Sequence, residues 1–574
     1  MPAHHAVWPA RLPAKISPPV TSLWMNLAIS AMRYPDKPAV VYMTRVWSYR
    51  ELQAAAEKMA CALAALGVRA GDRVILNMQN CPQLVITHFA ILRLDAVVVP
   101  VNPMNKAEEL KHYITDPDAR VAVTTADLAP ELAQASDALP ADQQLQHLVV
   151  TQFSDVFDPE AVADDDMPQA WRSWLLPVRD LPTLAAGETH AWRTLLEAAP
   201  DASLPPVQAS RDDLAILPYT SGTTGRSKGA MLTHGNMLSN ALTLKDYWGW
   251  KTSGGPDGRG DVLIHALPIF HVHGLFVAIH GALINGSKMI WMAKFDPKRA
   301  IGYMAKATVF MGVPTLYVRM LAEPTLNKAA VKNMRLFIAG SAPLLIETFT
   351  EWQERTGHTI LERYGMSETA MLTSNPYASD KRYGQQSARR GGTVGFPLPG
   401  VSLRVRGDDG QDLPVGEIGG IQVQGPNVFK GYWRMPEKTA EEFTADAYFK
   451  TGDVGKVDER GYVTIVGRSK DLIISGGYNV YPAEIEGYIN EMKGVAESAV
   501  VGVPHPDFGE VGVAVVIAKA GAALQPEAII AELKAKLANF KIPKKCFVVT
   551  ELPRNTMSKV QKNLLRDQYK GLFA

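Results

Sequence analysis

Cysteine is scarce in this sequence: three occur in 574 residues, at Cys61, Cys81 and Cys546. They lie far apart and form no CxxC pair, which argues against a disulfide framework and against a cysteine zinc site. Long hydrophobic runs are also missing. No stretch approaches the roughly 18 apolar residues of a membrane-spanning helix, and the first 20 residues lack the apolar core of a secretory signal. We therefore expect a soluble, cytoplasmic protein.

A charge excess is missing as well. The chain has 59 Lys and Arg against 58 Asp and Glu, a net charge of +1. Such a chain has no global attraction for nucleic acid or for an anionic membrane, so any anion must be held by a local site. Apolar residues make up 47% and charged residues 20%, which is typical of a globular protein. The length predicts two to four folding units.

Short β-rich apolar runs alternate with amphipathic helical patterns through most of the chain. The runs begin at Arg73, Ala96, Arg120 and Arg335, and a helical pattern ends at Gly67. This alternation favours a layered α/β architecture.

Two stretches depart from that alternation. Residues 126–210 are rich in Ala, Asp and Pro and carry Trp171, Trp174 and Trp192. We interpret them as an irregular surface excursion, partly ordered by these aromatic rings. From residue 470, a helix, two strands, a second helix and a basic tail follow one another. They predict a small α+β domain over 470–574, joined by a hinge to a large domain over 1–469.

The motif richest in chemistry is YTSGTTGRSKG, residues 219–229, which follows a strand-like run that begins at Leu214. Glycines let backbone N–H groups approach oxyanions, and hydroxyls add charge-assisted hydrogen bonds. Arg226 and Lys228 supply cations. The order is not that of a Walker loop, because no Ser or Thr follows the lysine. A flexible polar turn is the alternative interpretation.

YTSGTTGRSKG resembles the signature loop of the adenylate-forming superfamily, which includes the acyl-CoA synthetases. Further motifs follow in family order: LPIFHVHG, AGSAP, RYGMSET, TGDVG, GRSKDLIISGG and LPRNTMSK. The resemblance implies an α/β fold, with a large N-terminal adenylate-forming domain of several subdomains and a small mobile C-terminal α+β domain. It also implies an enzyme that joins a carboxylic acid to coenzyme A through an acyl-adenylate, using ATP and Mg²⁺. Catalysis would come from positioning and charge neutralisation.

Residue by residue, the resemblance implies an ATP site. The β- and γ-phosphates would be held by Thr220, Ser221, Gly222, Thr223, Thr224 and Lys228. Glu368 would bind Mg²⁺, and Ser367, where the family usually has Thr, would bond the α-phosphate. Tyr364 would stack on adenine, with Gly340, Ser341 and Ala342 beside it. Asp453 would accept both ribose hydroxyls, with help from Arg468.

The two half-reactions would use different parts of the small domain. Lys559 would bridge the acid and the α-phosphate, although Ser558 stands where the family usually has Gly. Lys470 would be the hinge. Rotation about it would bring Ser475, Gly476 and Gly477 to the thiol tunnel, which His271 would gate. Taken alone, each of these residues would be assigned a structural role in a turn, in the core or on the surface. The motifs are what favour a functional role.

The identity of the acid depends on GVPTLYVRM, residues 312–320. Strand-like spacing would put Arg319 on the same side as Tyr317, and a cation there suits a second carboxylate. Arg319 could instead extend to solvent or pair with a neighbouring acid. From about residue 214 onward, the chain is similar to bacterial malonyl-CoA synthetases. That resemblance implies malonate, bound by Arg319 with Ser341 and His271 nearby, and methylmalonate as a possible side substrate.

Three alternatives stay open at the level of sequence. The first is a medium-chain fatty or aryl acid:CoA ligase, which a cation in the pocket fits poorly. The second is a catalytically silent nucleotide-binding scaffold, against which Lys559, Glu368 and Asp453 argue. The third is transfer to a carrier protein, which presents the same phosphopantetheine arm as coenzyme A. The sequence does not give the oligomeric state.

Overall fold

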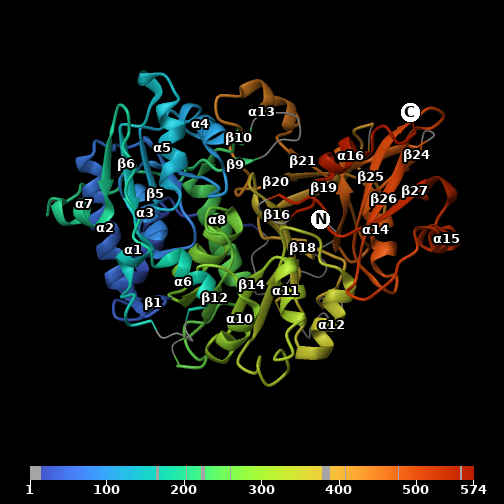
Figure 1. Ribbon diagram of the computed structural model, residues 1–574, viewed down its shortest axis with the longest axis horizontal. Helices are drawn as coiled ribbons and strands as arrows, with labels where there is room; N and C mark the ends of the chain where they lie inside the picture. The colour runs from blue at the N-terminus through green and yellow to red at the C-terminus, as the bar shows by residue number, and fades with distance from the viewer. Residues whose placement is uncertain are drawn as a thin grey trace.

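The computed structural model describes residues 15–162, 167–201, 203–220, 227–258, 260–377, 388–407, 409–475, 478–555 and 559–573. In this part of the chain, two large mixed sheets with helices around them form the N-terminal region (Figure 1). A four-stranded sheet follows, and then a five-stranded sheet forms the small C-terminal region at the opposite end of the molecule. The α/β fold and the division into a large and a small region agree with expectation.

The first large sheet has the order β18-β17-β16-β15-β14-β12-β13-β1-β2. Its parallel strands are β1 (Pro38–Tyr42), β12 (Val262–His265), β13 (Lys288–Trp291), β14 (Val309–Gly312), β15 (Leu336–Ala339) and β16 (Leu361–Met366). Its antiparallel strands are β2 (Arg45–Ser48), β17 (Ala370–Ser374) and β18 (Phe396–Pro397).

The second large sheet has the order β11-β8-β4-β3-β5-β6-β7. Its parallel strands are β3 (Arg73–Asn77), β4 (Val97–Pro100), β5 (Val121–Thr125), β6 (His147–Thr151), β7 (Glu188–Ala191) and β8 (Leu214–Ile216). Short β11 (Leu232–Thr233) pairs antiparallel with β8. The strands expected from the apolar runs at Arg73, Ala96, Arg120 and Arg335 are all present.

The largest core cluster contains buried residues of both large sheets and of the helices packed on them. In α3 (Pro82–Arg93) every residue except Arg93 is buried, which is the pattern of a helix covered on all sides. The helix α2 (Tyr49–Ala65) begins with a capping box, in which Ser48 and Glu51 exchange hydrogen bonds. It ends just before Gly67, whose φ of 91° suits glycine.

The segment 126–210 is more regular than expected. It contributes β6 and β7 to the second sheet, together with α5 (Ala129–Asp137), α6 (Gln169–Leu175) and α7 (Trp192–Ala198). Trp171 and Trp192 are buried in the main core and so attach this segment to it. The interpretation as an irregular excursion is therefore wrong for these elements. Among the described residues, it fits the connections around 157–162, 177–187 and 203–213.

The four-stranded sheet joins the two ends of the molecule. It is antiparallel and has the order β19 (Ser402–Arg406), β20 (Gly419–Gln424), β21 (Phe449–Val457) and β22 (Val463–Arg468). A short 3-10 turn over Ser469–Asp471 leads from β22 into the small region.

The small region is built around a long hairpin of β25 (Val495–His505) and β26 (Gly509–Ala518). The strands β23 (Ile473–Ser475), β24 (Tyr478–Val480) and β27 (Lys545–Val549) complete its sheet. Helices α14 (Pro482–Asn490) and α15 (Pro526–Lys536) confirm the expected helices, whereas the tail contains α16 (Lys562–Tyr569) and the strand β27 in addition. One ion pair between the regions joins Lys519 to Glu347, at 2.6 Å between Nζ and Oε1.

Candidate active site

The signature loop closes on a short hairpin. β9 (Tyr219–Thr220) and β10 (Lys228–Gly229) pair antiparallel, with Lys228 opposite Thr220. The Tyr219 hydroxyl donates to Asp116 at 2.6 Å and so fixes the start of the loop. The Lys228 ammonium lies 4.2 Å from the centre of the Tyr432 ring. The predicted phosphate ligands Ser221, Gly222, Thr223 and Thr224 lie outside the described residues.

Glu368 lies beside the base of this loop. It is 5% exposed, at the turn between β16 and β17, and Ser367 precedes it in the same turn. The Tyr432 hydroxyl donates to its carboxylate at 3.2 Å. Burial raises the pKa of Glu368, while hydrogen bonds from Thr220 and Tyr432 act in the opposite direction. A backbone hydrogen bond and the charge of Arg468 also lower this pKa, yet it stays raised, and a bound cation would stabilise the buried carboxylate.

Asp453 forms a second buried acidic centre. Its Cα lies opposite that of Arg468 on the neighbouring strands β21 and β22. Arg468 Nε lies 2.7 Å from one carboxylate oxygen, and the Tyr364 hydroxyl donates to the other. Burial raises the pKa of Asp453 and the charge of Arg468 opposes that shift. Three residues predicted to bind the nucleoside, from separate strands, are thus brought together.

Lys559 reaches this centre from the small region. The Lys559 backbone N–H donates to the Asn555 side-chain oxygen at 3.0 Å. In return, the Asn555 backbone N–H donates to the Lys559 carbonyl at 2.9 Å. The lysine side chain is exposed to solvent. Desolvation by the surrounding protein, and then the charge of Arg468, lower its pKa, whereas Asp453 and Glu368 raise it. Ser558, which replaces the usual Gly, lies outside the described residues.

A buried guanidinium lies close to Lys559, and the sequence analysis missed it. Arg363, in β16, is 2% exposed, and none of its three side-chain nitrogens has a hydrogen-bond partner among the described residues. Burial lowers its pKa to about 9. A Cβ on Gly340 would lie 2.7 Å from Arg363 Cζ, so glycine at 340 makes room for the guanidinium. An uncompensated buried cation of this kind points to an anionic ligand.

Two histidines line the same place. His271 and His273 stand at the start of a π-helical segment, His273–His280, a conformation found frequently at functional sites. Burial lowers the pKa of His271 to about 3, with the charges of Lys559 and Arg363 acting in the same direction. Burial and the charge of Arg363 lower the pKa of His273 as well. Both rings are therefore neutral near pH 7, and Nε2 of His273 has no partner among the described residues.

Ser341 lies beside His273. Its hydroxyl lies 3.2 Å from His273 Nδ1, and its φ of 69° is in the left-handed region. Holding a non-glycine residue in that backbone region costs on the order of 1 kcal/mol. Residues strained in this way are concentrated at functional sites. Ala342 follows it in the same partly exposed turn.

The strain at Ser341 gives a stability prediction. Ser341→Gly should raise the free energy of unfolding by up to about 1 kcal/mol, because glycine adopts φ of 69° freely. Ser341→Ala is the matched control, since it also removes the hydroxyl but keeps the strain. Chemical denaturation measures both. Equal stabilities for the two variants would contradict strain at this position.

Arg319 departs from its expected placement. Residues 314–321 form a helix, α11 (Pro314–Leu321), with proline at its first position. The strand-like interpretation is wrong, because residues two apart lie on opposite faces of a helix. Tyr317 is buried, whereas Arg319 is exposed, with its guanidinium 5.1 Å from the centre of the Phe295 ring.

Of the loop predicted for thiol transfer, the structure describes Ser475, which lies apart from the nucleotide residues. Ser475 is buried at the end of β23, in a hairpin with β24, and Gly476 and Gly477 lie outside the described residues. Figure 1 places β24 on the outer side of the small region, away from β16 and β21. Lys470, in the connecting turn, is exposed, and desolvation and Arg468 lower its pKa.

Comparison with known families fits this geometry. A family model described as AMP-binding enzyme matches residues 27–433, and one described as AMP-binding enzyme C-terminal domain matches residues 484–559. The chain belongs to the AMP-binding enzyme family. The signature loop, Tyr364 and Glu368 lie within the first matched region, and Lys559 is the last residue of the second.

Relatives of this AMP-binding enzyme are acid:CoA ligases. A long-chain-fatty-acid–CoA ligase of Yersinia pestis is 32% identical over 98% of this chain and 97% of its own length. A feruloyl-CoA synthase of an Amycolatopsis species is 34% identical over 93% and 96%. ATP-bound MatB of Rhodopseudomonas palustris is 43% identical, with a TM-score of 0.83 over 98% of this chain and 100% of MatB. This chain is an AMP-forming acid–thiol ligase, and its use of ATP and coenzyme A is consistent with these relatives.

The comparisons leave the acid open, since the relatives act on chemically different acids. In the described part of the chain, no helix is both long and apolar enough to cross a membrane.

Proposed function

We propose that this ligase activates malonate as malonyl-adenylate and transfers the malonyl group to coenzyme A, with methylmalonate as a side substrate. The observation that carries the proposal is the buried, unpartnered guanidinium of Arg363. The similarity to bacterial malonyl-CoA synthetases from residue 214 onward supports the same substrate.

The energetic argument compares two classes of acid. An unpaired charge in the protein interior costs several kcal/mol. The methylenes of a fatty acid or the ring of an aryl acid would leave that cost in place. A second carboxylate would offset it through paired hydrogen bonds, the geometry for which a guanidinium is suited. A dicarboxylic acid therefore fits this pocket better than a monocarboxylic acid.

The positions of the two cations also favour a short diacid. Lys559 and Arg363 are near enough for their charges to influence each other and to act together on His271. One carboxylate would face Lys559 and the reacting phosphorus, and the other would face Arg363. His273 and Ser341, linked at 3.2 Å, would supply neutral hydrogen bonds to the acid.

The nucleotide would lie across the two buried acids. Glu368, whose pKa burial raises, suits the Mg²⁺ ion that ATP brings, because Mg²⁺ prefers carboxylate and phosphate oxygens. When bound, the ion would neutralise phosphate charge. Thr220 and Lys228 would hold the phosphates, Ser367 the α-phosphate, and Asp453 with Arg468 the ribose. Tyr364 would position the adenine end, beside Gly340 and Ala342.

The chain's own part in the first step is positioning and charge. The acid oxygen attacks the α-phosphorus and pyrophosphate leaves, while the Lys559 ammonium holds both the carboxylate and the phosphate in line. Rotation about Lys470 would then withdraw Lys559 and bring Ser475, Gly476 and Gly477 to the thiol, with His271 at the gate.

The test is a substrate panel with purified protein, ATP and Mg²⁺. Malonate, methylmalonate, succinate, acetate, octanoate and ferulate would be compared by pyrophosphate release and by acyl-CoA mass. We expect malonate to give the highest kcat/KM. Preference for octanoate or ferulate would overturn the malonate assignment and leave the ligase assignment intact, whereas no release of pyrophosphate with any acid would contradict both.

Arg319 is a second candidate for the distal carboxylate. If it turns inward from its exposed position when malonate binds, Arg319→Ala should lower kcat/KM for malonate by the equivalent of about 2–5 kcal/mol, with little effect on acetate. Steady-state kinetics on both acids measure this. Unchanged malonate kinetics would show that Arg319 stays at the surface, and would assign recognition to Arg363.

A further inference from the structure

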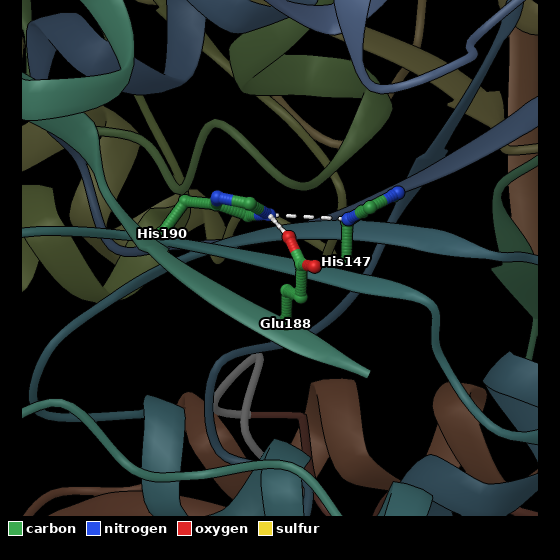
Figure 2. A group of neighbouring side chains, drawn as sticks. All are labelled: His147, Glu188 and His190. Carbon is green, nitrogen blue, oxygen red and sulfur yellow. Dashed lines mark hydrogen bonds and ion pairs between the residues drawn. The ribbon is translucent and has the colours of Figure 1, made fainter. Parts of the chain in front are cut away.

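A cluster of metal-binding side chains lies outside the active site, in the segment 126–210. His147 lies on β6, and Glu188 and His190 lie on the edge strand β7 (Figure 2). Their ligand atoms lie within 4.8 Å of one another. His190 Nε2 is central, at 3.1 Å from His147 Nδ1 and 3.8 Å from Glu188 Oε2.

The strand register produces this cluster. Residues two apart on a strand share a face, so Glu188 and His190 point to the same side of β7. The parallel pairing places His147 directly opposite Glu188. Just before β7, Gly187 lets the two backbones approach closely, because a Cβ there would lie 2.4 Å from the Leu145 carbonyl oxygen. The three ligands are therefore fixed by the backbone of the sheet.

We propose that His147, Glu188 and His190 bind one divalent transition-metal ion, of which zinc fits best. Two ligands at about 2.05 Å from a tetrahedral zinc ion lie roughly 3.3 Å apart. The distances of 3.1 and 3.8 Å lie on either side of that value. Two imidazoles and one carboxylate form a ligand set that zinc accepts, with a further position left for water.

The surroundings of the ligands support binding. His147 and His190 are partly buried, which restricts the positions of their rings on the sheet. The Glu188 side chain is 75% exposed, so an ion from solvent can reach the cluster. The hydrogen bond between the two histidines is the arrangement that the ion would replace.

The bound ion would connect β7 to β6 at the end of the second large sheet. In Figure 1, β6 and α7 lie at the opposite end of the molecule from the small region, far from β21 and β16. From its position, the metal would stabilise the sheet and take no part in catalysis. The site is separate from the Mg²⁺ site proposed at Glu368. An edge strand gains most from such a link, because it is paired on one side only.

The test uses the untagged, full-length chain treated with a chelator, without nucleotide, and titrated with zinc chloride by calorimetry. We expect one ion per chain and a rise of the melting temperature with zinc. Cobalt should give the visible absorption of a tetrahedral site. His190→Ala should weaken binding at least roughly 100-fold, and Glu188→Gln about tenfold.

His505→Ala, in the small region, is the matched control and should bind zinc as the native chain does. Melting of each variant without metal establishes that it is folded. Failure of the native chain to bind zinc, or equal binding by His190→Ala, would overturn the proposal.

Discussion

Lys559→Ala is expected to abolish malonyl-adenylate formation and yet to leave the second half-reaction almost unchanged. Removing one positioned charge from a transition state costs about 10²–10³-fold in rate. In the present arrangement of the two regions the charges of Arg468, Asp453 and Glu368 act on the Lys559 ammonium, and under the proposed function this arrangement serves adenylation. Pyrophosphate release measures the first step, and acyl-CoA formation from supplied malonyl-adenylate measures the second. Equal loss of both steps would contradict a role confined to the first.

Gly477→Trp is the reciprocal variant. A large side chain in the predicted thiol tunnel should block transfer to coenzyme A and leave adenylation intact.

The pH dependence of adenylation gives a second test of the role of Lys559. Since desolvation and Arg468 lower the pKa of Lys559, the ammonium loses its proton at a pH below its usual range. Adenylation should therefore decline as pH rises through that lowered pKa, and Lys559→Arg should move the decline to higher pH.

Arg363→Met is expected to remove the preference for malonate. Deleting one partner of a buried charge pair costs about 2–5 kcal/mol, which corresponds to roughly a 30- to 5,000-fold fall in kcat/KM. Activity with acetate should be kept or improved, because methionine removes an uncompensated charge from a pocket that then holds an uncharged methyl group. Steady-state kinetics with the two acids measure the effect. An unchanged ratio of malonate to acetate activity would contradict recognition by Arg363.

The same variant should be more stable than the native chain when no ligand is present. The three unpartnered nitrogens of the Arg363 guanidinium impose the desolvation cost of a buried charge, which is several kcal/mol. Arg389→Met is the matched control. Its guanidinium donates to three carbonyls, of Thr359, Pro376 and Tyr377, so its loss should lower the melting temperature. A fall of similar size in both variants would mean that Arg363 contributes to folding instead of binding.

Local patterns predicted much of the fold. The apolar runs that begin at Arg73 and Arg335 are central strands, and the helical pattern before Gly67 ends where expected, because these elements bury a repeating set of side chains. The segment 312–320 was misassigned, since its short apolar run fits both a strand and a helix. Pro314 at the first helical position and the spacing of Tyr317, Met320 and Leu321 carried the correct signal.

The residues of the candidate site were predicted from their resemblance to family motifs, and the spacing and chemistry of the residues contributed less. Asp453, Arg468 and Tyr364 meet as the resemblance implied, although nothing in their spacing shows it. Arg363 was missed because a charged residue beside Tyr364 looks like an ordinary surface cation. Its burial depends on packing from distant segments, including Gly340 and the π-helical segment, which a single sequence does not reveal. A cation inside an otherwise interior strand was the available clue.

The ion pair between Lys519 and Glu347 bears on how the enzyme completes a cycle. Both side chains are about half exposed, 49% and 48%, so the contact is hydrated and screened by salt. An ion pair this weak can break and re-form in every turnover of the proposed cycle without a large barrier. Ionic strength should therefore tune how long the two regions dwell in the arrangement that presents Lys559, and the balance between half-reactions should shift with the salt content of the medium.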